Sequence, residues 1–250
     1  MTPSGVRLDR DGPVAIVELC RPEVRNAQTP QMWGELREIG RRLPGDVRLV
    51  VVRGQGPAFS AGLDRSVLGS GLVAELAGLP PEVAADRIAE FQQAFGWLRR
   101  PDLVTVAAVQ GHAVGAGFQL ALACDLRVLT EDAQLTMAEV TLGLVPDLGG
   151  SKRLVELVGY ARALEICLTG RRVDAAEALR VGLANLVVPG PELAAAVADL
   201  TAAVLAADRN AVVEIKALLA GAAARAYPDQ ERAEREAQVR RLRDLAGAGE

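Results

Sequence analysis

The hydrophobic positions of the chain predict strands that alternate with helices over roughly the first 190 residues. Residues 13–20 (PVAIVELC) and 48–53 (RLVVVR) are short β-branched runs bounded by Gly or Pro, as buried strands are. Between them, apolar residues from Met32 to Leu43 recur at the spacing of one helix face. The chain is therefore expected to open with a strand, a helix and a second strand.

The same pattern continues downstream and then changes. A helix is predicted over residues 91–98, a strand over 103–109, a helix from about Gly115, and short strands over 126–129, 134–137 and 185–188. Residues 69–81 form a Gly-rich stretch that is expected to be mobile. From Glu192 onward the patterns are only helical and rich in Ala. An α/β core with an α-helical appendage is expected, with a boundary near residue 190.

Composition narrows the classes of function. The 250 residues are 50% hydrophobic and 24% charged, which predicts a folded protein with a sizeable core. Aromatic residues make up 3%, the formal net charge is −4, and a nucleic-acid partner is not expected. The start of the chain does not resemble a signal peptide, and no uncharged apolar run reaches 18 residues, so we expect a cytoplasmic protein without a membrane partner.

The reactive side chains are few. One histidine, His112, and three scattered cysteines cannot form the usual zinc cluster or a disulfide framework. Residues 149–152 (GGSK) have the wrong order for a P-loop, and glycines at 111, 115 and 117 do not fit the dinucleotide-binding pattern. Ser60 lies in a near match to a nucleophile elbow, but Ala58 stands where the elbow needs Gly. A serine hydrolase with His112 as base is thus a disfavoured alternative.

Two Gly-rich segments remain as candidates for chemistry. Residues 59–64 (FSAGLD) follow a predicted buried strand, and residues 109–120 end a strand and enter a helix. Small residues at such junctions leave backbone N–H groups open to a ligand, and a helix N-terminus adds partial positive charge. Two converging junctions would make an oxyanion hole. The glycines could equally serve only close packing of the helix.

Five segments taken in order resemble the crotonase superfamily, the enoyl-CoA hydratases and isomerases. They are RPEVRNA at 21–27, FSAGLD at 59–64, GHAVGAGFQLALACDLRV at 111–128, AEV at 138–140, and GLVP at 143–146 with two glycines following. The resemblance implies an α/β fold, a spiral of repeated ββα units, with a C-terminal α-helical trimerisation region. It divides the chain into a core with an acyl-CoA site over 1–190 and an oligomerisation region over 191–250, and it implies a homotrimer or hexamer.

The resemblance also implies a site. The thioester oxygen of an acyl-CoA substrate would be held by the backbone N–H groups of Leu63 and Ala116. Coenzyme A is then part of the substrate, and neither a metal nor another cofactor is expected. The residues expected to contact CoA are Arg25, Ala27, Ala61, Asp64 and Arg65.

The acidic residues favour one reaction over another. Hydratases of the family use two glutamates; Glu139 matches one of these positions, and Gln119 occupies the other. Because Gln cannot exchange a proton at neutral pH, a double-bond shift with Glu139 as the only base is favoured over hydration. Asp147 stands where dienoyl-CoA isomerases of the family carry a second acid, and it is either catalytic or part of a polar loop. The alternative function is an acyl-CoA-binding homologue with little or no catalysis.

Overall fold

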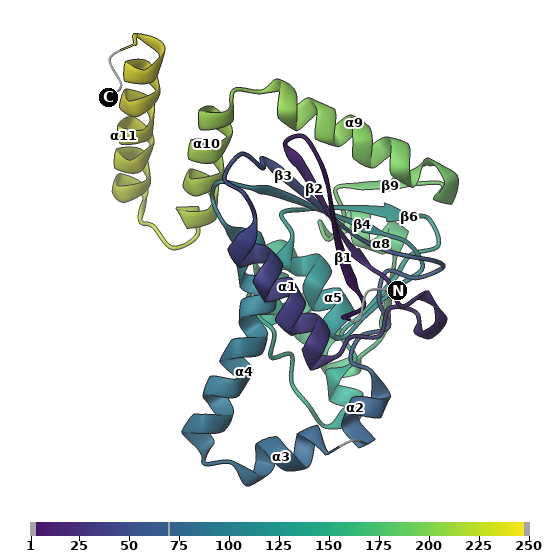
Figure 1. The fold of residues 1–250 in the computed structure, drawn as a ribbon. Helices are drawn as coiled ribbons and strands as arrows, with labels where there is room; N and C mark the ends of the chain where they lie inside the picture. The colour runs from purple at the N-terminus through teal and green to yellow at the C-terminus, as the bar shows by residue number, and fades with distance from the viewer. Residues whose placement is uncertain (1–3, 70, 248–250) are drawn as a thin grey trace.

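A six-stranded sheet forms the centre of the computed structural model, which describes residues 4–69 and 71–247 (Figure 1). The strand order is β1-β2-β3-β4-β6-β9; β1 and β2 are antiparallel, and every other neighbouring pair is parallel. The strands are β1 (Val6–Asp11), β2 (Val14–Leu19), β3 (Leu49–Gly54), β4 (Val104–Val109), β6 (Leu126–Thr130) and β9 (Leu186–Val188). The carboxyl ends of the parallel strands therefore meet at one edge.

A second, smaller sheet lies at that edge. Its order is β5 (His112–Val114), β7 (Gln134–Thr136) and β8 (Arg172–Asp174), with β5 parallel to β7 and β7 antiparallel to β8. An isolated bridge joins Ser60 to Ala113 of β5, and another joins Gln28 to Leu63. These bridges bring three segments that are distant in sequence to one place.

Helices cover both faces of the larger sheet. Alternate residues of β3 separate the two cores: Val50 and Val52 pack with α1 (Pro30–Arg42), α4 (Pro81–Gly96) and α5 (Ala116–Ala123), while Leu49 and Val51 pack beneath α9 (Leu193–Ala206). Figure 1 shows α9 on the face opposite to α1 and α5. The helical segment after residue 190 thus begins with a helix that shares the core of the sheet.

Local sequence explains where α1 begins. Thr29 accepts a hydrogen bond from the Met32 amide (3.3 Å), and Pro30 occupies the first turn. The buried side of α1 carries Met32 and Trp33, and the Trp33 ring lies 5.0 Å from that of Phe91 on α4. The apolar stripe of the sequence is therefore the face that joins α1 to the core.

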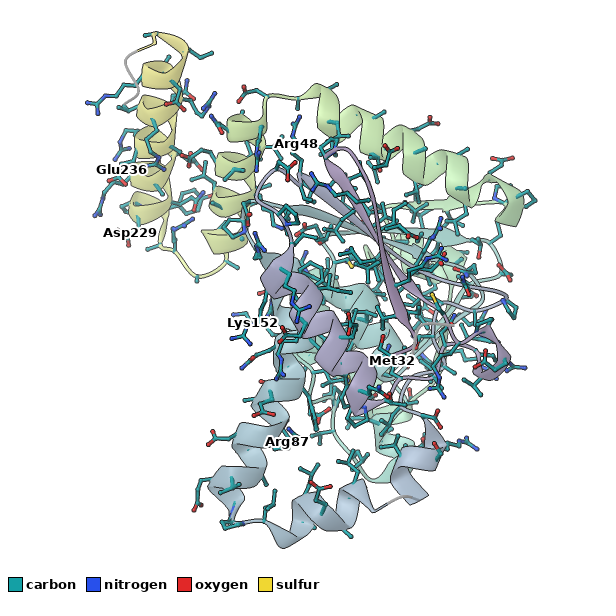
Figure 2. All side chains as sticks on the ribbon, viewed as in Figure 1. Met32, Arg48, Arg87, Lys152, Asp229 and Glu236 are labelled. Atoms are coloured by element: carbon teal, nitrogen blue, oxygen red, sulfur yellow. The ribbon has the colours of Figure 1, made fainter. Side chains whose placement is uncertain are left out.

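The last two helices, α10 (Arg209–Ala222) and α11 (Tyr227–Leu245), form a hairpin beside the sheet (Figure 1). Lys216 of α10 contacts Asp125 (2.7 Å), and Arg48 donates to the carbonyls of Leu205 and Ala207 at the end of α9. Figure 2 shows Arg48 at this junction and shows Asp229 and Glu236 on α11, away from the sheet. In the described ranges, no single helix is long and apolar enough to span a membrane. The segments Gly190–Ala206 and Arg209–Ala222 reach that length and apolar character only when taken together, and the chain bends by 104° between them.

The remaining helices connect these layers. They are α2 (Arg65–Gly69), α3 (Leu72–Gly78), α6 (Gly150–Val158), α7 (Tyr160–Thr169) and α8 (Ala175–Arg180), with short 3-10 turns η1 (Pro22–Val24), η2 (Trp97–Arg99), η3 (Glu139–Leu142) and η4 (Gly190–Glu192). The strands and helices that the sequence predicts are present in the predicted order, and the structure adds the strands β1, β5 and β8 and the helices between residues 139 and 185. Within the stretch at 69–81, residues 72–78 form the helix α3, which the sequence pattern does not predict, and the mobility of the stretch stays a prediction; residue 70 lies outside the described residues.

Candidate active site

The loop after β3 lies against the N-terminus of α5. Gly62 has a positive φ of +82°, and a Cβ added there would be 2.4 Å from the Val114 carbonyl oxygen and 3.6 Å from the Ala116 nitrogen. Only Gly tolerates both the conformation and the close approach. The two Gly-rich junctions of the sequence therefore converge.

Each junction contributes a free backbone N–H. Gln28 pairs with Gly62 O (2.6 Å) and Asp64 N (2.8 Å), so the N–H of Leu63 between them points to the opposite side. Ala116 is the first residue of α5, where an N–H has no acceptor within the helix. In the part of the chain that the structure describes, neither N–H donates to another protein group. Both are available to an oxygen that gains negative charge.

Glu139 places a carboxylate beside these donors. It begins η3, it is buried, and its Oε1 lies 3.3 Å from where a Cβ of Gly115 would be, next to Ala116. Gly115 combines φ +50° with ψ −117°, a backbone conformation that favours Gly over residues with a side chain. Oε1 accepts a hydrogen bond from Gln119, whereas the buried Oε2 has no protein partner among the described residues. Burial, and secondarily the charge of Asp147, raise the pKa of Glu139.

Gln119 is fixed in one orientation. It is buried on α5, and its Oε1 accepts from the backbone N–H groups of Leu148 (2.9 Å) and Gly150 (3.2 Å). Because two N–H donors can only face an oxygen, the amide NH₂ must face Glu139, to which Nε2 donates at 2.7 Å. The side chain thus holds Oε1 of Glu139 and leaves Oε2 as the free oxygen.

Asp147 lies in the loop that contacts Gln119, directly before Leu148. Its side chain is half-buried, and burial raises its pKa. Its backbone carbonyl accepts a hydrogen bond from Gln92 of α4 (2.7 Å). The structure therefore joins Glu139 and Gln119 by a direct hydrogen bond, whereas Asp147 acts on Glu139 only through its charge, which raises the pKa of Glu139.

The residues expected to contact CoA also lie side by side. Ala61 N donates to Arg25 O (2.8 Å), and Gln28 pairs with the next residues of the same loop, up to Asp64. Arg25 is exposed in a left-handed conformation (φ 52°), and Arg65, also exposed, begins α2. These two cations flank the segment that carries the free N–H of Leu63.

The other two of these residues have partners of their own. Ala27 is buried, and its carbonyl accepts from Arg21 (2.6 Å). Asp64 accepts from the backbone and hydroxyl of Ser66 and pairs with Arg21 (2.9 Å). The hydrogen bond from Ser66 is the main cause of its lowered pKa, and Arg21 contributes. Arg21 is a structural link between the two loops that sequence reasoning missed.

The serine-hydrolase alternative finds no support in the geometry. Ser60 is completely buried, and its hydroxyl donates to the carbonyl of Asn26 (2.8 Å) rather than to His112. Sequence reasoning also missed the buried side chains of Asn26 and Gln28 beside it. Asn26 lies inside the 21–27 segment and Gln28 directly follows it, which was the only signal in the sequence for either side chain. In the described residues, no group of three His, Cys, Asp or Glu side chains could hold a metal ion.

Taken together, these features define an α/β protein in which two free backbone N–H groups and a buried glutamate lie where the loop after β3 meets the N-terminus of α5. The sequence profile of the enoyl-CoA hydratase/isomerase family matches residues 9–244. The chain belongs to this family, within the crotonase superfamily, and it is an enzyme of the hydratase/isomerase type.

Named relatives agree with this assignment. A "putative enoyl-CoA hydratase" from Thermobifida fusca YX, solved in complex with CoA, is 51% identical with a TM-score of 0.92, over 98% of this chain and 95% of that chain. A second T. fusca YX structure, in complex with acetoacetyl-CoA, is 48% identical over 96% of both chains, also with a TM-score of 0.92. A "probable enoyl-CoA hydratase" of Mycobacterium tuberculosis is 38% identical over 92% of this chain and 86% of its own length. The predicted fold class and enzyme type are confirmed.

Proposed function

We propose that this enzyme shifts the double bond of an enoyl-CoA thioester, with Glu139 as its only base, and that hydration is a minor activity. The observation that carries this proposal is the state of the Glu139 carboxylate. One oxygen is held by Gln119, while the other is buried, has no protein partner among the described residues and lies by Gly115, the residue before Ala116.

The proposed reaction begins with a 3-enoyl-CoA. Its thioester oxygen accepts hydrogen bonds from the N–H groups of Leu63 and Ala116, which stabilise the enolate that forms when a C2 proton leaves. Glu139 Oε2 takes that proton, the electron pair spreads over C2 to C4, and the same carboxyl returns the proton to C4. The product is a 2-enoyl-CoA. A pKa raised by burial suits this step, because the carboxyl must both accept and release the proton.

Hydration requires more than this site offers. Hydration needs a second carboxylate, so that one of the pair activates the water and the other protonates the substrate carbon. Gln119 occupies the position of that second carboxylate. The Gln119 oxygen already accepts two backbone N–H groups, and its NH₂ is a donor, so it cannot take a proton from water.

The CoA part of the substrate is proposed to lie along Arg25, Ala27, Ala61, Asp64 and Arg65. Exposed Arg25 and Arg65 suit its phosphates, and the T. fusca YX relatives were solved with CoA and acetoacetyl-CoA.

The role of Asp147 is decided by Asp147→Asn: loss of turnover with intact folding assigns it to catalysis. The homotrimer or hexamer is likewise a proposal, tested by light scattering of the purified protein.

The experiment for the isomerase proposal is Glu139→Gln. Turnover of a 3-enoyl-CoA should be lost, whereas calorimetric binding of CoA esters should remain, because the N–H donors and the CoA contacts are unchanged. Glu156→Gln, a matched change on the outer side of α6, should keep wild-type turnover. Unchanged turnover in Glu139→Gln would contradict the proposal.

The second candidate is a binding protein that holds acyl-CoA without changing it. The observation that favours it is the neutral Gln119 at a position where two-acid catalysis needs a carboxylate. Calorimetry with several acyl-CoA esters, followed by mass analysis after long incubation, separates the two candidates. Product from any ester excludes a purely binding role.

A further inference from the structure

We infer that Ser60 is a positioning residue that fixes the two N–H donors, Leu63 and Ala116, relative to each other. This inference rests on the proposed oxyanion hole. It gives a role to the one hydroxyl that the sequence singled out and that the proposed reaction leaves unused.

The Ser60 hydroxyl has three hydrogen bonds inside the protein. It donates to the carbonyl of Asn26 (2.8 Å) and accepts from Gln28 Nε2 (3.1 Å) and from Gly62 N (3.2 Å). A hydroxyl has one donor and two acceptor positions, so this group is fully used. Ser60 is completely buried, so no water competes for these bonds.

The rest of Ser60 contacts the second donor segment. Its backbone pairs with His112 O (2.9 Å) and Val114 N (3.0 Å) of β5. A Cβ built on Gly117 would lie 2.6 Å from the Ser60 carbonyl oxygen, 2.8 Å from its Cβ and 3.0 Å from its Oγ. Ser60 therefore packs directly on the first turn of α5.

One residue thus contacts both chain segments that carry a donor. Gly62 directly precedes Leu63, and Gly117 directly follows Ala116. Gly62 has no side chain to restrict its φ and ψ, so the loop needs an external restraint to hold the Leu63 N–H in one direction. The backbone of Gln28 restrains the carbonyl side of Gly62, and the hydrogen bond from Gly62 N to the Ser60 hydroxyl supplies the restraint on the amide side.

A surrounding network holds the hydroxyl in turn. Gln28 Oε1 accepts from Trp33 Nε1 (2.8 Å), which fixes the orientation of the Gln28 amide so that its NH₂ faces Ser60. Asn26 Nδ2 donates to the carbonyls of Gln55 (2.9 Å) and Ala58 (2.8 Å). These bonds anchor Asn26, whose backbone carbonyl accepts the hydrogen bond from the Ser60 hydroxyl. The network extends from α1 to the loop after β3.

The test is Ser60→Ala in the full chain, with kcat and KM measured on a 3-enoyl-CoA. Removing one oxyanion donor outright costs about 10²- to 10³-fold in rate, so a donor that is retained but displaced should cost roughly tenfold in kcat. KM should change little, because the CoA contacts remain. The C=O stretch of bound crotonyl-CoA, recorded by isotope-edited infrared spectroscopy, should shift less from its free value than in the wild type.

The matched control is Thr105→Val. Thr105 is also completely buried, and its hydroxyl lies 3.0 Å from Leu98 O and from Asp125 Oδ2 and accepts from Asp125 N (2.9 Å). It lies near the amino end of β4, at the opposite edge of the sheet from Ser60. The control should lose comparable stability but keep the wild-type kcat and C=O shift.

The outcomes separate this inference from the proposed function. A wild-type kcat and C=O shift in Ser60→Ala, or an equal loss of kcat in Thr105→Val, would overturn the positioning role. Should Ser60→Ala not fold, Ser60→Cys keeps a side chain of similar shape with weaker hydrogen bonds, and it is judged by the same two measurements. Turnover retained in Glu139→Gln would remove the isomerase proposal alone, since the C=O shift reports the donors without any reaction.

Discussion

Replacing Gln119 by Glu should convert the site toward hydration. In the wild type, Nε2 of Gln119 is 2.7 Å from Oε1 of Glu139, while the Gln119 oxygen accepts from Leu148 N and Gly150 N. In Gln119→Glu the same two backbone N–H groups bind one carboxylate oxygen. The other oxygen then faces Glu139 at hydrogen-bonding distance.

The size of the effect follows from the separation of the two carboxylate charges, which is larger than the distance between their facing oxygens. Two unit charges about 4 Å apart repel by roughly 4 kcal/mol at an effective dielectric constant of 20, which corresponds to about three pKa units. The pair should therefore share one proton near neutral pH and titrate as a unit. One carboxylate can then activate a water while its partner supplies a proton, and general acid–base catalysis of this kind contributes about 10²- to 10⁴-fold.

Two assays follow this change. Hydration of crotonyl-CoA in H₂¹⁸O should rise at least about tenfold over the wild type, and Gln238→Glu, a matched change on the exposed surface of α11, should not alter it. The shared proton raises a carboxyl pKa above its unfolded value, so stability of the variant should fall as pH rises from the unfolded pKa through that raised pKa. Wild-type hydration together with a wild-type stability curve would refute the reasoning.

Three further predictions concern the same scaffold. Because burial raises the pKa of Glu139, the acid limb of kcat/KM should lie above the ordinary glutamate range, and Glu139→Gln should be more stable than the wild type at neutral pH; an acid limb at the usual value contradicts this. The Arg127 side chain is buried and, among the described residues, donates to backbone carbonyls, so Arg127→Met should leave buried acceptors unpaired and lower the free energy of unfolding by about 1–3 kcal/mol for each of them, seen as a lower urea midpoint. Gly62→Ala places a Cβ 2.4 Å from the Val114 carbonyl, so it should abolish turnover and lower the melting temperature; normal turnover would contradict the packed junction.

Much of the fold could be predicted because, along most of the chain, the spacing of the apolar residues and the types of residue indicate the same element. The run at 48–53 has apolar residues on both sides of the strand, and the structure buries both faces of β3 between helices. The helix from about Gly115 is confirmed as α5, since small residues open it and apolar ones follow. The sequence pattern does not predict β1, because this strand lies at the edge of the sheet and its two apolar residues, Val6 and Leu8, are separated and followed by charged residues.

The candidate site was predictable in its residue types but not in its bonding. Glu139, Gln119 and Asp147 could be singled out from sequence, yet the direction of the Gln119 amide depends on Leu148 N and Gly150 N, which are 29 and 31 residues away. Long-range bonds of this kind leave no periodic signal. The buried network around Ser60 was missed for the same reason, because the hydrogen bonds of the Ser60 hydroxyl to Gln28 and Asn26 join residues 32 and 34 positions apart.

The most direct test of the central claim uses the wild-type enzyme with a 3-enoyl-CoA in H₂¹⁸O. The products are identified by mass spectrometry, and the initial rate is compared with that of hydration of the matching 2-enoyl-CoA. Catalysis by the single base Glu139 predicts a 2-enoyl-CoA of unchanged mass, formed faster than any hydrated product. A main product that is a 3-hydroxyacyl-CoA carrying ¹⁸O would contradict it.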